Sequence, residues 1–255
     1  MKFILVLLIF SCSNFTLAST LPDIIVKNKP AIVAVGTVMP KRSPSALFMG
    51  TGFAIGDGSL IVTNAHVVPD NLNSVEFETL AIFQRQNEQI KALKVKLVGI
   101  DKTHDIAVLK ILTGRLPALK IAEKNHIVRE GESIAFTGFP IGMVLGLYPV
   151  THTGIISAIS PVAIPQIKSR QLNARLLKRL REPYNVYQLD ATAYPGNSGS
   201  PVYNVETGKV IGVINKVFVK ETKETVLSKP SGITYAIPIK HVYNLIEKMQ
   251  LLDVM

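Results

Sequence analysis

Short runs rich in valine, isoleucine and aromatic residues follow one another along most of the chain, and they constrain its fold more than any other feature. Glycine, proline, asparagine and aspartate separate the runs, as they do at turns between strands. Long helical patterns are almost missing between them, so the chain must close or stack antiparallel sheets. We expect an all-β fold with strands at 31–38, 52–55, 60–63, 75–83, 90–100, 105–112, 133–137, 153–159, 186–189, 209–215 and 233–237.

Two segments repeat their apolar residues at helical spacing instead. After Pro238, one stripe contains Val242, Leu245, Ile246 and Met249, which predicts an amphipathic C-terminal helix. The second helical pattern spans residues 171–181. Residues 130–132, Glu-Gly-Glu, form a plausible seam between two halves of the chain.

Composition narrows the class of protein. Hydrophobic residues make up 47% of the 255 residues and charged residues 18%, so a sizeable core is available and wholesale disorder is excluded. The net charge of +10 favours contact with anionic surfaces but does not bear on the fold. Cys12 is the single cysteine, which excludes an intramolecular disulfide and a thiolate metal cluster.

The first eighteen residues have the pattern of a secretory signal peptide. Lys2 precedes the apolar run 3–10, and Thr16-Leu17-Ala18 places small residues at the cleavage positions. A membrane anchor is the alternative, but eight apolar residues fall short of the roughly 20 that span a bilayer. A lipid-modified start at Cys12 is disfavoured by the bulky Phe10. We therefore expect an exported protein, periplasmic or secreted.

Residues 191–201, Ala-Thr-Ala-Tyr-Pro-Gly-Asn-Ser-Gly-Ser-Pro, form the sharpest chemical motif. A serine between glycines on a tight turn is exposed, and backbone N–H groups around it can point at one spot. The amides of Gly196 and Ser198 could form an oxyanion hole, which binds the negative oxygen of a tetrahedral intermediate. An ordinary glycine-rich loop is the alternative.

A serine hydroxyl needs a base to become a nucleophile. His66 ends an apolar strand at 61–68, so its ring is delivered into a turn. The other histidines lie in polar surroundings and are expected at the surface: His104, His126, His152 and His241. Asp105 heads the apolar run 106–111 and could orient the imidazole, although it could also be a simple strand-start cap. The order histidine, aspartate, serine strengthens each assignment.

Three blocks together resemble the trypsin-like serine proteases of the chymotrypsin fold, and in particular the disulfide-poor HtrA/Deg-like bacterial branch. They are Gly-Thr-Gly-Phe at 50–53 leading to Thr-Asn-Ala-His-Val-Val at 63–68, Asp-Ile-Ala-Val-Leu at 105–109, and Pro-Gly-Asn-Ser-Gly-Ser-Pro at 195–201. The run 232–238 also resembles the last strand of that branch. The match covers about residues 24–240. Gly-Asn-Ser-Gly-Ser-Pro is similar to glutamyl endopeptidases as well.

The resemblance implies two packed, six-stranded antiparallel β-barrels with the site between them. The N-terminal barrel would span about 24–128, the C-terminal barrel about 129–238 and the C-terminal helix about 239–252, within a protease domain at 19–255. The resemblance assigns His66 as general base and acid, Asp105 as its orienting carboxylate and Ser198 as nucleophile. HtrA enzymes continue into a PDZ domain, whereas only a short segment follows Pro238 here.

Departures from the family pattern concern activation and specificity. Asn197 replaces the aspartate that pairs with a new N-terminus in digestive relatives, so activation by trimming is not expected. By resemblance, Thr192 and Ala193 lie at the base of the specificity pocket and lack a carboxylate that could hold lysine or arginine. Ile214 and Asn215 line the adjoining strand. We expect small or medium apolar residues on the acyl side, unless Lys216 points inward and favours acidic ones.

The partners that we expect are peptides or unfolded protein substrates. Lysine and arginine concentrate between residues 168 and 181, which is either a solvated basic helix or a contact with anionic surfaces. Nucleic acid is not expected, because the protein is exported and lacks an aromatic platform among these charges. Neither a metal nor another cofactor is expected, since His-Glu-x-x-His, cysteine pairs and a Walker loop are missing. The oligomeric state is not determined by the sequence.

Three classes of function remain open at this level. An exported serine endopeptidase is the leading hypothesis, because all three catalytic residue types are present. A non-catalytic binding protein on the same fold and a chaperone-like holdase are the alternatives.

Overall fold

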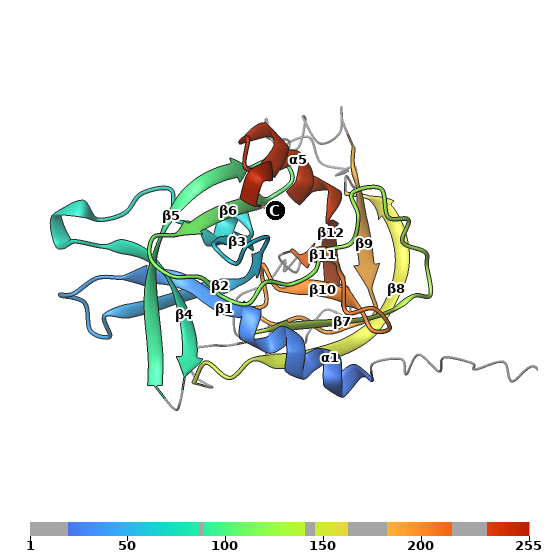
Figure 1. Cartoon of the computed structure of the whole chain (residues 1–255), viewed down its shortest axis with the longest axis horizontal. Coiled ribbons are helices and arrows are strands. Elements are labelled where there is room, and N and C mark those ends of the chain that lie inside the picture. The colour runs from blue at the N-terminus through green and yellow to red at the C-terminus, as the bar shows by residue number, and fades with distance from the viewer. Residues whose placement is uncertain (1–19, 87–88, 141–145, 163–182, 216–233, 255) are drawn as a thin grey trace, which may run out of the picture.

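Two closed β-barrels lie side by side in the computed structural model, which describes residues 20–86, 89–140, 146–162, 183–215 and 234–254 (Figure 1). Each barrel contains six strands among these residues, and the strands pair antiparallel throughout. The all-β fold with two six-stranded barrels and a C-terminal helix is therefore confirmed.

The first barrel has the strand order β1-β2-β3-β6-β5-β4. Its strands β3 and β6 consist almost wholly of buried apolar residues, because both of their faces are covered by protein. Strand β3 ends just before the turn that carries His66, and β6 begins directly after Asp105. The bounds are β1 Ile32–Val38, β2 Ala46–Ile55, β3 Leu60–Thr63, β4 Thr79–Gln86, β5 Gln89–Asp101 and β6 Ile106–Ile111.

The second barrel has the strand order β10-β11-β12-β9-β8-β7. Its central strand β11 is buried along its whole length and pairs with β10 on one side and β12 on the other. The turn that contains Ser198 leads directly into β10. The bounds are β7 Ser133–Gly138, β8 Val150–Pro161, β9 Asn185–Leu189, β10 Pro201–Asn204, β11 Val210–Ile214 and β12 Thr234–Pro238.

Three strand predictions need correction. β10 was not expected, because it is short and begins with a proline directly after a glycine-rich turn. β2 begins at Ala46 rather than at residue 52, since the strand runs through Gly50 and a bulge opposite Val35 and Gly36. The expected strand 75–83 begins only at Thr79: residues 74–76 form a 3-10 turn, and Phe77 is left-handed with φ of 56°.

Helices lie at the two ends of the described chain. The C-terminal helix α5, Lys240–Lys248, has the expected apolar stripe. The sequence reasoning missed α1, Leu21–Asn28, whose first turn is closed by the carboxylate of Asp23 accepting from the N–H and hydroxyl of Thr20. Single 3-10 turns are η1 Lys29–Ala31, η2 Ala65–Val67, η3 Ser74–Glu76 and η5 Leu252–Val254.

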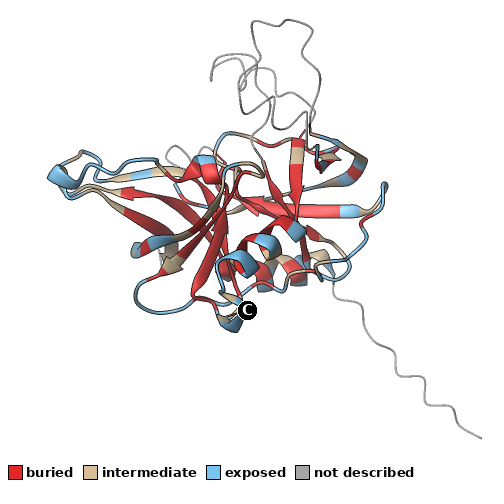
Figure 2. Cartoon of the chain, turned by 90° about the horizontal axis from the view of Figure 1, so that it is seen from above, coloured by how far each residue is buried: buried red, intermediate tan, exposed pale blue. Residues whose placement is uncertain are grey.

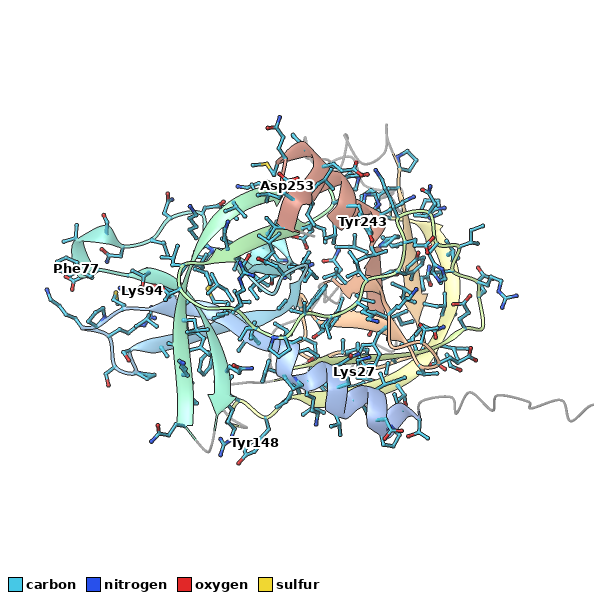
Figure 3. The ribbon with its side chains drawn as sticks, in the orientation of Figure 1. Lys27, Phe77, Lys94, Tyr148, Tyr243 and Asp253 are labelled. Carbon is cyan, nitrogen blue, oxygen red and sulfur yellow. The ribbon has the colours of Figure 1, made fainter. Side chains whose placement is uncertain are left out.

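The segment between β6 and β7 bonds to both barrels and so fixes one against the other. Leu119 N donates to Ala54 O of β2 at 2.8 Å, and Ala122 N donates to Val210 O of β11 at 2.8 Å. Helix α5 adds a third tie, because the hydroxyl of Tyr243 donates to Ala122 O at 3.1 Å (Figure 3). The segment and the helix hold the two barrels in a defined relation.

Buried residues fill the interior of each barrel and continue between them (Figure 2). Phe77, by contrast, is exposed at the outer end of the first barrel, away from the second (Figure 3). None of the helices described is long and apolar enough to cross a membrane. The described residues do not include the predicted signal peptide at 1–18, the predicted helix at 171–181, the basic segment 168–181 or Lys216.

Candidate active site

His66 and Asp105 form a tightly bonded pair at the edge of the first barrel. Strand β3 ends at Thr63, and the single turn η2 then carries His66 with its ring partly exposed. Nδ1 of His66 lies 2.7 Å from Oδ2 of Asp105, and the backbone N–H of His66 donates to Oδ1 at 3.0 Å. A carboxylate only accepts, so Nδ1 bears the proton and Nε2 is left free to act as a base.

The backbone of Asp105 is held as firmly as its side chain. Its carbonyl accepts from Nδ2 of Asn64 at 3.0 Å and from the N–H of Ala65 at 3.2 Å. Asp105 is only 4% exposed and adopts a left-handed conformation with φ of 56°. Aspartate tolerates this conformation better than most residues, and the surrounding bonds hold it there. The aspartate and the segment preceding His66 thus form one rigid unit.

Asp101 closes the turn that delivers Asp105. Its carboxylate accepts from the N–H groups of Thr103 and His104 and lies 2.6 Å from the ring Nδ1 of His104. Burial acts to raise the pKa of Asp101, but the bonds from His104 and Thr103 together outweigh it, and the net effect is a lowered pKa. The carboxylate therefore stays ionised and keeps this turn closed.

Of the histidines expected at the surface, His241 is buried and His152 is half-buried. His241 of α5 is 5% exposed, stacks on His104 with the ring centroids 4.0 Å apart and meets the edge of Tyr184. Burial, and then the charges of His104 and Lys240, lower its pKa to about 3. His152 stacks on Phe136, and burial lowers its pKa too. Both rings pack against other aromatic rings, and the polar residues next to them in the chain did not indicate this packing.

The Ser198 turn presents two unpaired amides. Asn197 N donates to Tyr194 O, Gly199 N to Ile214 O and Ser200 N to Asn197 O, each at 3.0 Å. Within the described chain, the N–H groups of Gly196 and Ser198 donate to no acceptor. Gly196 has φ of 100° and Gly199 of 87°, where a side chain would be strained. Two free N–H groups on one tight turn are the donors that an oxyanion hole requires.

The first barrel contacts this turn directly. Thr51 N of β2 donates to Ser198 O at 2.8 Å. A methyl group at Gly50 would lie 2.6 Å from Cγ2 of Val67 and 2.9 Å from Ser198 O, so the residue after His66 and the backbone of Ser198 flank the same glycine. The described residues contain no hydrogen bond between the Ser198 hydroxyl and His66. Such bonds are often long in enzymes without substrate and tighten when it binds.

The predicted specificity residues adjoin the Ser198 turn. Ala193 is buried and Thr192 half-buried, and Thr234 of β12 pins this segment: its hydroxyl donates to Ala191 O and accepts from Ala193 N at 3.2 Å. No sequence pattern singled out Thr234 beyond its place in an expected strand. Ile214 is fully buried, and its N–H and carbonyl bond to Ser200 and Gly199.

Ile214 therefore acts on the site through its backbone. Asn215 is half-buried and donates its N–H to Tyr235 O at 2.8 Å, which continues the pairing of β11 with β12. Thr192 and Ala193, which the sequence assigned to the base of a specificity pocket, are small and neutral, and that assignment stays a prediction.

Asn197 lies beneath the turn, fully buried. Neither polar atom of its side-chain amide has a hydrogen-bond partner among the described residues. It packs with Ser200 against Gly138, where any side chain would overlap the Ser200 hydroxyl. No group of three or more histidine, cysteine, aspartate or glutamate residues in the described ranges is placed to hold a metal ion.

Comparison with known proteins agrees with this geometry. Residues 50–213 match the family model described as "Trypsin-like peptidase domain". The match spans the two segments of the His66–Asp105 pair and the Ser198 turn. The chain therefore belongs to the trypsin-like peptidase family.

Within that family the chain is similar to HtrA-type serine proteases. It is 31% identical over 191 residues to the "Probable periplasmic serine endoprotease DegP-like" of Halomonas elongata, covering 75% of this chain and 33% of that protein. It matches the crystal structure of the serine endoprotease from Yersinia pestis with a TM-score of 0.62 and 28% identity, over 92% of this chain and 68% of that one. The HtrA-type protease AlgW with decapeptide shares the fold, with a TM-score of 0.66, 22% identity and coverage of 92% and 68%.

The chain spans only 33% to 42% of the length of the first curated relatives that it matches. The family and the fold of the described residues are thus defined, and the activity of this chain is inferred below from its own site.

Proposed function

We propose that the protein is an exported serine endopeptidase of the HtrA type, with Ser198, His66 and Asp105 as its catalytic triad. The observation that carries the proposal is the pairing of an imidazole, held by a buried carboxylate at 2.7 Å, with a serine turn whose two amides are unpaired among the described residues. A base with a free Nε2 and a preformed pair of N–H donors serve acyl transfer. Periplasmic relatives and the N-terminal leader pattern support export.

The reaction follows from these groups. Ser198 Oγ attacks the carbonyl carbon of the peptide bond while its proton passes to Nε2 of His66. The N–H groups of Gly196 and Ser198 stabilise the oxyanion, and Asp105 stabilises the imidazolium. The C–N bond then breaks, and His66 gives its proton to the leaving amine. Water repeats the sequence on the acyl-enzyme, which releases the carboxylic acid and restores Ser198.

The pocket base supports a preference for small or medium apolar residues on the acyl side. Thr192, Ala193 and the buried Thr234 provide no carboxylate that could hold arginine or lysine. Peptides and unfolded chains are the proposed substrates, in line with the peptide-bound structure among the similar proteins.

Incubation of the purified protein with a denatured protein substrate tests both the catalytic triad and the preference on the acyl side. We expect fragments whose new C-termini are mostly valine, alanine or leucine, as read by mass spectrometry. Ser198→Ala should abolish the cleavage. Ser200→Ala is the matched control, because the hydroxyl of Ser200 has no partner among the described residues, and it should keep the activity. Cleavage that persists in Ser198→Ala contradicts the triad, and a clear preference for arginine contradicts the pocket assignment.

Binding of the denatured protein without cleavage, unchanged in Ser198→Ala, would instead favour the binding-protein or holdase alternatives.

A further inference from the structure

Every polar group of Thr51 in β2 is hydrogen-bonded, and its N–H and hydroxyl bond across to the second barrel. Its N–H donates to Ser198 O at 2.8 Å, and its hydroxyl donates to Gly196 O at 2.7 Å. The same hydroxyl accepts from the N–H of Phe139, directly after β7, at 3.1 Å. Its carbonyl accepts from the hydroxyl of Thr63 at 2.7 Å. Thr51 is fully buried, so these bonds do not compete with water.

The topology of the first barrel explains why Thr51 is available. Strand β3 pairs with β2 only as far as Val62 opposite Phe53, and it ends at Thr63. Strand β2 therefore extends past its neighbour, and the N–H of Thr51 faces the place where β3 would have continued. The Ser198 turn of the second barrel occupies that place. The hydroxyl of Thr63, three residues before His66, donates to the carbonyl oxygen of Thr51.

Each of the two unpaired amides belongs to a residue whose carbonyl is held by Thr51. Gly196 and Ser198 each have an N–H without an acceptor among the described residues, and the carbonyl oxygen of each accepts a hydrogen bond from Thr51. Gly196, at φ of 100° and without a Cβ, has little steric hindrance to rotation of its peptide groups. The hydrogen bond from the Thr51 hydroxyl is the contact that holds the Gly196 carbonyl in one direction.

We propose that Thr51 is a positioning residue that orients the oxyanion-hole donors of Gly196 and Ser198 relative to His66. The inference rests on the proposed protease function and adds to it a residue that touches neither substrate nor reacting atoms. Its hydroxyl acts on the second barrel, while its carbonyl is tied to the strand that ends before His66. A shift of this one side chain therefore changes the distance between nucleophile turn and base.

Thr51→Val and Thr51→Ser separate the hydroxyl from the rest of the side chain. Valine keeps the shape and the backbone bond to Ser198 but loses the bonds to Gly196 and Phe139. We expect kcat on a peptide substrate to fall roughly 10- to 100-fold with KM changed less than about threefold, because a displaced oxyanion donor costs less than the 10²- to 10³-fold of a missing one. Serine keeps the hydroxyl, and kcat should return to within about threefold of the original.

Thr37→Val is the matched control. Thr37 is equally buried in the first barrel, and its hydroxyl donates to Glu78 at 2.6 Å and accepts from Arg42 at 3.0 Å, far from the Ser198 turn. Loss of this hydroxyl should lower the unfolding temperature without lowering kcat. Equal kcat in Thr51→Val and the unaltered protein, or a Thr51→Ser variant as slow as Thr51→Val, would overturn the proposal.

Hydrogen exchange of the turn provides a readout that does not need activity. In Thr51→Val the bonded amides of Asn197 and Ser200 should exchange at least about tenfold faster, and in Thr37→Val they should not. If the unaltered protein shows no Ser198-dependent hydrolysis, the proposed function fails, and hydrogen exchange of the turn then tests the positioning role of Thr51 by itself. Faster exchange then supports the positioning role, and unchanged exchange overturns it.

Discussion

The two barrels differ in how the groups that they contribute to the site are hydrogen-bonded. In the first barrel, Asp105 accepts hydrogen bonds from the side chain of Asn64, from the N–H of Ala65 and from the N–H and ring Nδ1 of His66. The His66–Asp105 pair is therefore held entirely by residues of that barrel. In the second barrel, the Ser198 turn leaves two amides unpaired among the described residues and takes its outside support from Thr51. His66 is therefore ordered within its own barrel, whereas the Ser198 turn is bonded to both barrels, through Ile214 of its own barrel and Thr51 of the other.

This difference has an energetic meaning. Paired donors stabilise the first-barrel unit by roughly 0.5 to 1.5 kcal/mol each, more where the carboxylate accepts. An unpaired donor shielded from water costs free energy, which is recovered only when an oxyanion takes the place of the missing acceptor. Gly196 and Ser198 are half-buried, so this cost is small in the free protein and their N–H groups stay available to an oxyanion.

The largest expected effects come from deleting one group on each side of the comparison. Ser198→Ala and His66→Ala should each lower kcat by at least about 10⁴-fold, and the double variant should lose little more, because the two groups act as a unit. Peptide hydrolysis under single-turnover conditions, together with an unchanged near-ultraviolet circular dichroism spectrum, provides the measurement. Additive losses in the double variant would contradict a shared proton transfer.

Asp105→Asn tests the first-barrel unit alone. Asparagine tolerates the left-handed backbone, so the fold should persist. Its amide group can donate to Nδ1 and stabilise the wrong tautomer, and kcat should drop about 10³- to 10⁴-fold. Asp101→Asn serves as the comparison, since that carboxylate closes the preceding turn without contacting His66, and its loss should be much smaller. Equal losses in the two variants would argue against a special role for Asp105.

Gly50→Ala tests the contact between the two sides. The added methyl group would lie 2.6 Å from Val67 and 2.9 Å from Ser198 O, so it must push the nucleophile turn away from the His66 segment. We expect a roughly 10- to 100-fold lower kcat, comparable with a geometric misplacement of about 1 Å. Val67→Ala in the same chain removes one of the two clashes and should recover part of the rate. Full activity of Gly50→Ala would show that the turn tolerates displacement.

The last prediction concerns the stability of the fold around α5 and leaves catalysis aside. His241 has a pKa of about 3 in the folded protein against about 6.5 when unfolded, so only the unfolded chain takes up this proton between those pH values. Stability from this group is complete above pH 6.5 and falls by about 1.4 kcal/mol per pH unit as the pH drops toward 3.

His241→Phe keeps the ring stacking and should flatten the pH dependence of the unfolding free energy between pH 6.5 and 4, measured by urea denaturation. The groups that face His241 are His104, Tyr184, Asp101 and Lys240, and they remain in the variant. An unchanged pH dependence would mean that His241 is not buried uncharged behind the Asp105 turn.

The sequence was sufficient for the local features of the site. Short apolar runs predicted closed or stacked antiparallel sheets, and the family resemblance implied the two barrels. Strand ends flanked by polar residues predicted where His66 and Asp105 stand. The same reasoning missed Thr51, because its bond to Gly196 joins positions 145 residues apart and depends on the relative placement of two barrels. It misplaced His241 for a similar reason: the rings of His104 and Tyr184 that bury it come from distant segments.

Labelling with a fluorophosphonate tests the central claim most directly, since this reagent reacts with a serine hydroxyl that a base has activated. Mass spectrometry of the intact protein should show one modification, at Ser198, that forms in the unaltered chain and in Ser200→Ala. It should be lost in Ser198→Ala and slowed by orders of magnitude in His66→Ala. Labelling of another serine, or equal rates with and without His66, would contradict the account.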